Sequence, residues 1–293
     1  RRAVPRRRRR LWRARRLDSR RRTANAPEDR RNRRRHRQAK AFRLPLHNAL
    51  LYKKALKDIK PSPYFAFVVH IDGLRETHDI AVERAGVYDV AVRAIEEFRK
   101  AGHRVCTNTT LFSGNDPSEY HGLFAMLNDM GVEGMMVAPG FQYKEVAHHD
   151  IFLQREEARS FFRRIFEGCK DGIRFYNNPL YLDFLVGKRE YECTQWSTPT
   201  YTPAGWRKPC YLIADEHVTT FAQLMETDWK AYGFGKDERC NNCMMHCGYE
   251  GSALQEAMGS PKAFVELAWR SVKPRRVVQP VIEPEPVTEP AKA

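Results

Sequence analysis

Short apolar runs alternate with helix-like segments between residues 64 and 166, and this alternation constrains the fold more than any other feature of the chain. Residues 64–71 (YFAFVVHI) form a continuous, β-rich apolar run, which is typical of a strand buried on both faces of a parallel sheet. Residues 103–112 (HRVCTNTTLF) and 134–138 (GMMVA) predict two more strands. Strands joined by helix-length segments indicate βαβ units with right-handed crossovers, so the predicted class is α/β.

The segments that follow these runs carry apolar residues at helical spacing. In residues 87–101 they recur every three or four positions, and Gly102 follows at the end of the predicted helix. Residues 117–130 and 156–166 predict two more helices, and residues 260–272 predict a further one.

The formal charge of +15 is concentrated in an arginine-rich N-terminal arm. Residues 1–43 hold 21 of the 51 Lys and Arg residues and three of the 36 acidic residues, which leaves 30 basic and 33 acidic residues elsewhere. Such an arm buries too little apolar surface to fold. Three interpretations are open: a phosphate-binding arm, a solvated tail, or the product of out-of-frame translation of GC-rich DNA.

Long apolar segments are missing from the sequence. It contains no run of 18 or more apolar residues, and no apolar segment follows the basic residues of the arm. We therefore expect neither a membrane-spanning helix nor a secretory signal.

The seven cysteines fall into two groups. Cys106 and Cys169 lie in a predicted strand and at a predicted helix end, where lone cysteines usually serve as small core residues. The other five occupy a stretch rich in Pro, Gly, Tyr and Trp that has no regular period. Their pattern is Cys193-x11-Gly205-x4-Cys210, followed after 29 residues by Cys240-x2-Cys243-x3-Cys247.

The second group is typical of metal ligands. Two thiolates two residues apart can bind one metal centre from a single turn, and a distant pair then completes four ligands. Disulfides need an oxidising compartment, and an odd number of cysteines leaves one over; inert thiols are the third interpretation. Thiolates suit both Zn²⁺ and iron–sulfur clusters. The loose spacing of the first pair favours iron–sulfur, with four of the five as ligands, but spacing alone leaves zinc open.

Several segments resemble one enzyme superfamily. The C-x11-G-x4-C segment followed by CxxCxxxC resembles the auxiliary-cluster region of the SPASM/twitch type, and the β-α units before it resemble the C-terminal half of a radical SAM partial TIM barrel. More narrowly, residues 57–250 resemble the HpnH-type radical SAM enzymes of hopanoid biosynthesis, the adenosylhopane synthases. The segments that carry this resemblance are KPSPYFAFVVHIDGLRETHD, TNTTLF, GVEGM, LDFL, WSTPTY, GWRKPCYL, TDWKAYG and CxxCMMHCGYE.

The resemblance implies a transferase reaction. In the family, a [4Fe–4S] cluster on a CxxxCxxC loop cleaves S-adenosylmethionine, and the 5′-deoxyadenosyl radical adds to the alkene of hopene, a triterpene lipid, to give adenosylhopane. It further implies an auxiliary [4Fe–4S] cluster, an electron donor such as flavodoxin or ferredoxin, and no specific nucleic-acid partner. The implied location is the bacterial cytoplasm, with peripheral contact at the inner membrane surface.

The chain departs from the family pattern in its first part. It has no CxxxCxxC motif and no GGEP-like segment, and its one close cysteine trio has the reverse spacing. The family's LCTNALLL segment corresponds to PLHNALLY at residues 45–52. The two segments match from Asn48 onward, and the residues immediately before Asn48 do not match. We therefore expect this chain to be an incomplete, inactive copy.

The expected organisation has four parts. They are a disordered, frameshifted or mis-started arm at residues 1–47, a partial radical SAM β/α barrel at 48–170, a Cys-rich auxiliary-cluster region at 171–273, and a disordered tail at 274–293 that repeats Pro-Glu.

Polar residues near strand ends are candidates for the pocket of S-adenosylmethionine, because barrel active sites are built there. We assign Asp72 and Asn108 to that pocket; the alternatives are a turn-forming Asp-Gly and a hydrogen-bonded strand amide. We interpret His70 as a core histidine. We expect His148 and His149 to be solvated. The residues that could line a lipid-binding surface or exclude water from a cluster are Tyr201, Trp196 and Trp206.

Two other functions stay open on the sequence alone. One is a zinc-ribbon-like, nucleic-acid-binding module with a basic arm, which predicts bound zinc and salt-sensitive DNA binding. The other is a radical SAM enzyme that acts on another class of substrate.

Overall fold

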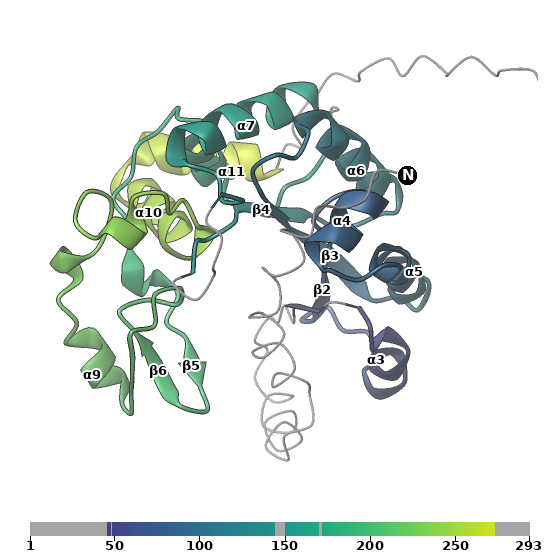
Figure 1. Ribbon diagram of the computed structural model, residues 1–293, viewed down its shortest axis with the longest axis horizontal. Coiled ribbons are helices and arrows are strands. Elements are labelled where there is room, and N and C mark those ends of the chain that lie inside the picture. The colour runs from purple at the N-terminus through teal and green to yellow at the C-terminus, as the bar shows by residue number, and fades with distance from the viewer. Residues whose placement is uncertain (1–45, 48, 144–149, 170–171, 273–293) are drawn as a thin grey trace, which may run out of the picture.

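The computed structural model describes residues 46–47, 49–143, 150–169 and 172–272 (Figure 1). In these residues the main sheet has the strand order β1-β2-β3-β4, and every neighbouring pair is parallel. The strands are β1 (Leu46–His47), β2 (Ala66–His70), β3 (Arg104–Leu111) and β4 (Met135–Pro139). The parallel order agrees with the βαβ prediction.

Helices connect these strands and cover the outer side of the sheet (Figure 1). They are α3 (Tyr52–Asp58), α4 (Arg75–Ala81), α5 (Val87–Lys100), α6 (Pro117–Asp129) and α7 (Arg155–Gly168). Helix starts follow from local chemistry: the Asp116 side chain accepts a hydrogen bond from Ser118 N, and Pro117 occupies the first turn of α6.

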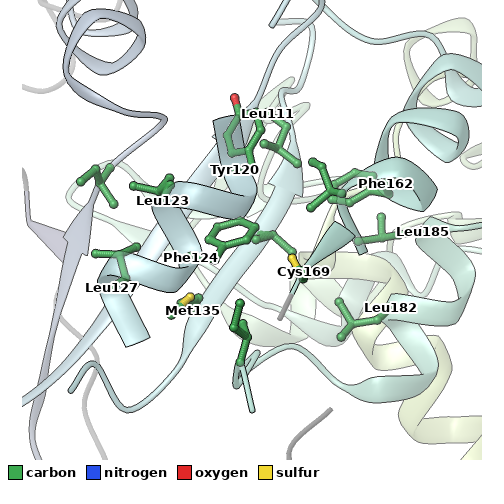
Figure 2. Close-up of a cluster of buried hydrophobic side chains, with 14 of the residues drawn as sticks. Leu111, Tyr120, Leu123, Phe124, Leu127, Met135, Phe162, Cys169, Leu182 and Leu185 are labelled. Carbon is green, nitrogen blue, oxygen red and sulfur yellow. The ribbon is translucent and has the colours of Figure 1, made fainter. Parts of the chain in front are cut away.

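The two faces of the sheet differ because side chains alternate along each strand. Phe67 and Val69 of β2 point to the helix side and belong to the main hydrophobic core, whereas Val68 belongs with Cys106 to a small apolar cluster on the opposite, inner face. Figure 2 shows the helix side, where α6 and α7 meet the sheet. The core residues drawn there include Leu111, Tyr120, Leu123, Phe124, Leu127, Met135, Phe162, Cys169, Leu182 and Leu185.

The C-terminal part of the described chain combines helices with a small antiparallel sheet. Its longer elements are α8 (Pro179–Leu185), α9 (Phe221–Met225), α10 (His246–Gly259) and α11 (Pro261–Val272), with β5 (Tyr201–Thr202), β6 (Gly205–Lys208) and β7 (Glu216–Val218). Short 3₁₀ turns lie at Gln195–Ser197, Trp229–Ala231 and Glu238–Cys240. In Figure 1 the small sheet lies on the side of α10 away from α7.

Most predicted elements are present, with shifts of a few residues at their ends. The three predicted strands correspond to β2, β3 and β4, and the four predicted helices to α5, α6, α7 and α11. The prediction of an irregular region after residue 171 is wrong, because α8 and α10 are regular helices. The assignment of residues 1–47 to a disordered arm is wrong at its last two positions, since Leu46 and His47 pair with Val68 and Val69. The rest of the arm and the tail from residue 273 lie outside the described residues.

Both lone cysteines are core residues, as predicted: Cys106 and Cys169 are fully buried. None of the helices in the described part of the chain combines the length and the apolar character needed to cross a bilayer.

Candidate metal centre

Five cysteine side chains line one pocket: Cys193, Cys210, Cys240, Cys243 and Cys247. They come from four separate segments of the chain, namely the loop before the Gln195–Ser197 turn, the loop after β6, the Glu238–Cys240 turn with the loop after it, and the first turn of α10. The fold therefore brings together all five positions that the sequence pattern singles out. The other lining residues are Phe141, Gln195, Pro209, Tyr211, Leu212, Ile213, Tyr232, Gly248 and Tyr249.

The glycine of the C-x11-G-x4-C segment has a structural role at the start of β6. Gly205 adopts φ +124°, and a Cβ at this position would lie 2.5 Å from Val218 O of β7. Only glycine combines this backbone conformation with so close an approach. β6 can therefore pair with β7 and lead directly to Cys210, whose thiol accepts a hydrogen bond from Ile213 N at 3.5 Å.

Two glycines in the first turns of α10 let the Cys193 segment approach the helix closely. A Cβ at Gly248 would overlap Cys193 Sγ, and one at Gly251 would overlap the Ser197 side chain. Hydrogen bonds hold the same segment in place, because Ser197 Oγ donates to Cys247 O at 2.7 Å. These contacts bring Cys193 and Cys247, which are far apart in sequence, to the same wall of the pocket.

Arg155 at the start of α7 packs directly behind the Cys243 loop. Its Nη1 donates to Cys243 O at 3.2 Å, and its backbone N donates to Asn242 Oδ1 at 3.2 Å. The side chain is 9% exposed, and its guanidinium carbon lies 4.6 Å from the ring centre of Phe234 and 5.1 Å from that of Phe184. A buried cation beside the pocket favours negative charge on the thiols.

Without a bound cation, the pocket disfavours the thiolate form of its cysteines. Burial raises the pKa of Cys193 and Cys247 well above the ordinary thiol value, and the neighbouring cysteines raise it further. Burial likewise raises the pKa of Cys243 to about 12, while Arg155 lowers it in part. Several thiols gathered in an apolar pocket ionise together only when a metal centre compensates their charge.

The type of donor side chain in the pocket bears on the kind of metal centre that it suits. All seven cysteines are free thiols at described positions. Within the residues that the structure describes, no three His, Cys, Asp or Glu side chains are placed to hold a metal ion. The ligands of a zinc ion converge on one point at about 2.3 Å from the metal, whereas a four-iron cluster binds each thiolate through a different iron. Five thiols around one pocket are a donor set that suits both zinc and an iron–sulfur cluster.

The pocket is tied to the end of the parallel sheet. Phe141, which lines it, follows β4 directly, and the Glu250 carboxylate of α10 accepts hydrogen bonds from Asn177 Nδ2 at 2.9 Å and Asn178 N at 3.1 Å. Asn177 in turn accepts from Val137 N of β4 at 2.7 Å. A chain of polar contacts therefore links the helix that carries Cys247 to the carboxyl end of β4.

The two residues predicted for the S-adenosylmethionine pocket lie close together, on either side of His70. Asp72 Oδ2 lies 2.6 Å from His70 Nε2, and Asn108 Nδ2 lies 3.3 Å from His70 Nδ1. Asp72 is completely buried, and its other oxygen accepts from Thr110 N at 2.8 Å. Burial alone would raise the pKa of Asp72, but the charge and hydrogen bond of His70 outweigh it and lower that pKa.

This arrangement changes the roles expected from the sequence. His70 is not a fully buried core residue, since its side chain is 19% exposed, and Asp72 orients it instead of forming a simple turn. Asn108 lies within β3, opposite His70 in the register. Of these three residues, His70 and Asn108 are partly exposed, whereas Asp72 is buried.

The remaining candidates lie away from the thiol pocket. Trp196 and Tyr201 are 44% and 63% exposed, and Trp206 packs against Tyr201 with 5.2 Å between ring centres, but none of the three lines the pocket. The aromatic rings that do line it are Phe141, Tyr211, Tyr232 and Tyr249. His148 and His149 lie outside the described residues. Sequence reasoning missed Arg155 and these four rings because no residue-type pattern marks them.

Comparison with known proteins gives limited matches. A family model described as a domain of unknown function (DUF3463) matches residues 135–267, and no curated protein matches. The chain is similar in part to Streptococcus suis SuiB (13% identity, 42% of this chain and 28% of that one, TM-score 0.37). It is also similar to TYW1 with a lysine-pyruvate adduct bound (15% identity, 44% and 42%, TM-score 0.34).

A second SuiB structure, bound to S-adenosylmethionine, matches at 15% identity over 42% of this chain and 27% of that one, with a TM-score of 0.33. The chain thus spans less than half the length of each of these structures. At these identities and TM-scores the likeness is a partial one of fold, and by itself it assigns no activity.

Proposed function

We propose that the five-cysteine pocket holds an auxiliary [4Fe–4S] cluster and that the chain belongs to a radical SAM enzyme of the HpnH type. The observation that supports the cluster most directly is that thiols from four separate segments line one pocket beside the end of a parallel sheet. When bound, such a cluster stores or relays single electrons. The chain itself supplies the thiolate ligands, the Arg155 cation behind them, and the aromatic rings that exclude water.

For the reaction, we propose transfer of the 5′-deoxyadenosyl group of S-adenosylmethionine to hopene, giving adenosylhopane. The support is the family resemblance of residues 57–250. On the inner face of the sheet, His70 and Asn108 would contact S-adenosylmethionine, and the buried Asp72 would hold His70 in position. We expect a second [4Fe–4S] cluster of the full-length family only. The electron donor would be a flavodoxin or ferredoxin, with the enzyme working at the inner membrane surface of a bacterium.

The 293 residues of this chain contain no CxxxCxxC motif. Because the family cleaves S-adenosylmethionine on a cluster held by that motif, we propose that this chain does not catalyse the transfer by itself. The auxiliary cluster is independent of this point, since all five of its candidate ligands lie at described positions.

Anaerobic purification followed by iron, sulfide and zinc analysis tests the cluster. We expect about four irons and four sulfides per chain, with the brown absorbance of a [4Fe–4S] centre. Stoichiometric zinc, or disulfides among the five cysteines, would contradict the proposal. About eight irons would show that a second cluster site is present, against the proposed loss of activity.

Matched variants assign the iron to the pocket. Cys243→Ser removes a ligand and should lower iron content, whereas Cys106→Ala, in the buried inner-face cluster, should leave it unchanged. Gly248→Ala drives a methyl group against Cys193 Sγ and should also lower iron content; Gly259→Ala on the same helix meets no atom within 4 Å and is its control. Equal iron in all four variants would place the metal elsewhere.

A further inference from the structure

Helix α11 packs onto the protein through its charged side chains. Arg270 Nη1 and Nη2 donate to the Asp183 carboxylate of α8 at 2.5 and 3.0 Å, and Glu266 accepts from Arg189 Nη2 at 2.6 Å. Ala263, which is 4% exposed, lies on the same side. Residues 263, 266, 267 and 270 have the spacing of one helix face, so this face is directed at the body of the protein.

The opposite face of α11 is apolar and exposed. Val265, Trp269 and Val272 are 65%, 61% and 78% exposed, and with Ala268 they again have the spacing of a single helix face. Phe264 beside them is 59% exposed. This is the reverse of an ordinary surface helix, which buries its apolar stripe and exposes its charges.

Helix α10, which contacts α11, also carries exposed apolar side chains (Figure 1). Leu254 and Met258 of α10 are 50% and 78% exposed. We call these six side chains the α10–α11 apolar surface: Leu254, Met258, Phe264, Val265, Trp269 and Val272. Several large apolar side chains exposed on two contacting helices mark a site of protein or membrane contact.

The exposed charge on α11 is basic, and basic residues follow the helix in the sequence. The exposed charged residue on α11 is Lys262, because the acidic Glu266 and the basic Arg270 are both used in the ion pairs with α8 and its neighbour Arg189. In the sequence, Lys273, Arg275 and Arg276 follow the helix directly. Two copies of the same surface would bring like charges together, whereas anionic lipid headgroups would complement them.

We propose that the α10–α11 apolar surface binds the surface of an anionic lipid bilayer, with α11 lying in the membrane plane. An apolar helix face with Trp and Phe, flanked by basic residues, is the composition of an interfacial helix. Twelve residues span about 18 Å as a helix, which is too short for a hydrocarbon core of about 30 Å, so the helix lies on the membrane and does not cross it. The proposal does not depend on the cluster or on the identity of the substrate.

The test is co-sedimentation of the full chain with vesicles of phosphatidylcholine mixed with phosphatidylglycerol. Because the arginine-rich arm would itself attract anionic vesicles, binding is measured in about 0.5 M salt, which screens that attraction over a few ångströms. The Val265→Ser/Trp269→Ser variant changes exposed side chains only and keeps the arm. We expect it to bind on the order of tenfold more weakly than the unchanged chain.

Two controls make the result specific. Tyr64→Ser removes an exposed aromatic ring from the segment before β2, outside α10 and α11, and should leave binding unchanged. Lys262→Gln, compared in low salt, should weaken binding by a few-fold, because each basic residue near an anionic surface contributes modestly. Circular dichroism confirms that each variant is folded.

Two results would overturn the proposal. The first is equal vesicle binding by the unchanged chain and the Val265→Ser/Trp269→Ser variant in high salt. The second is a dimer of the unchanged chain in sedimentation velocity that this variant converts to monomer, without vesicle binding by either; the surface would then be an interface between copies.

Discussion

Different interactions stabilise the parallel sheet and the cysteine-bearing region, by which we mean residues 187–243. Between residues 66 and 139 most strand positions are buried, and helices pack onto the sheet through large apolar side chains such as Phe98 and Phe124. Between residues 187 and 243, a range the structure describes in full, the buried apolar side chains are Leu212 and Leu224. Stretches with so little core need disulfides or metal to be stable. We therefore expect the cysteine-bearing region to depend on the proposed metal centre for its stability, and the sheet to be stable without it.

Removal of the metal gives the largest predicted effect and tests this difference directly. After anaerobic chelation of the iron, amides in residues 187–243 should lose protection in hydrogen exchange, because binding of the metal contributes much of the folding free energy of such a region. Amides of β2, β3 and β4 should keep their protection. Equal loss in both regions would show that they fold as one unit, and no loss in either would show that the metal has no structural role.

Removal of a core side chain should cost more stability in the sheet region than in the cysteine-bearing region. Phe124 is fully buried between α6 and the sheet, so Phe124→Ala should lower the free energy of unfolding by about 3–5 kcal/mol. The measurement is denaturant unfolding monitored by circular dichroism. Leu224→Ala is the matched change in the cysteine-bearing region, and with the metal bound it should cost less, since the metal centre holds that region. A larger cost for Leu224→Ala would reverse the comparison.

The sheet region should also weaken in mild acid. Burial lowers the pKa of His78 from 6.5 to about 4, although the charge of Asp72 opposes this, and His78 Nδ1 accepts from Asp72 N at 3.0 Å. Because the folded pKa lies below the unfolded one, the unfolded chain takes up the proton first as pH falls. The contribution of neutral His78 is therefore complete above about pH 6.5 and is lost towards about pH 4, on the order of 3 kcal/mol in all.

His78→Asn offers a matched test, because an amide oxygen can accept the same hydrogen bond without titrating. The variant should be less stable than the unchanged chain near neutral pH but should lose less stability between about pH 7 and pH 5. Melting temperatures across that range measure the difference. Parallel curves for the two proteins would show that His78 does not titrate between the folded and unfolded states.

The sequence predicted the sheet region well because its signals are local. β2 and β4 are apolar runs, β3 is rich in β-branched residues, and the helices α5, α6 and α7 show apolar spacing that depends only on neighbouring residues. α10 was missed because Gly248, Gly251 and Gly259 oppose helix formation. Two of those glycines serve packing instead, since they admit the Cys193 segment against the helix.

The sequence allowed prediction of the cysteines of the candidate site, but it did not allow prediction of the residues that contact them from distant segments. Five cysteines could be recognised as possible ligands from their spacing alone, and the fold places all five on one pocket. Arg155 could not be recognised, because 88 residues separate it from Cys243 and its sequence neighbourhood is that of an ordinary charged helix. Long-range contacts of this kind depend on the three-dimensional packing and leave no mark in local sequence.

The last prediction concerns this buried arginine and is the smallest in size. Arg155 places a positive charge behind the Cys243 loop, and reduction of a cluster adds negative charge to the pocket. Arg155→Met should therefore lower the reduction potential of the cluster by tens of millivolts, where about 59 mV corresponds to a tenfold change for a one-electron couple. Arg155→Lys should preserve most of the potential. The measurement is a redox titration followed by electron paramagnetic resonance.

Arg159→Met is the control, since Arg159 lies on the same helix and forms its ion pairs with Glu156 and Glu190 at the surface. An equal shift in the Arg159 variant would mean that the potential reflects the overall charge of α7. An unchanged potential in Arg155→Met would mean that the guanidinium only clamps the loop. In that case the cysteine-bearing region would depend on α7 for its position alone, and the charge balance of the pocket would have to come from the metal centre itself.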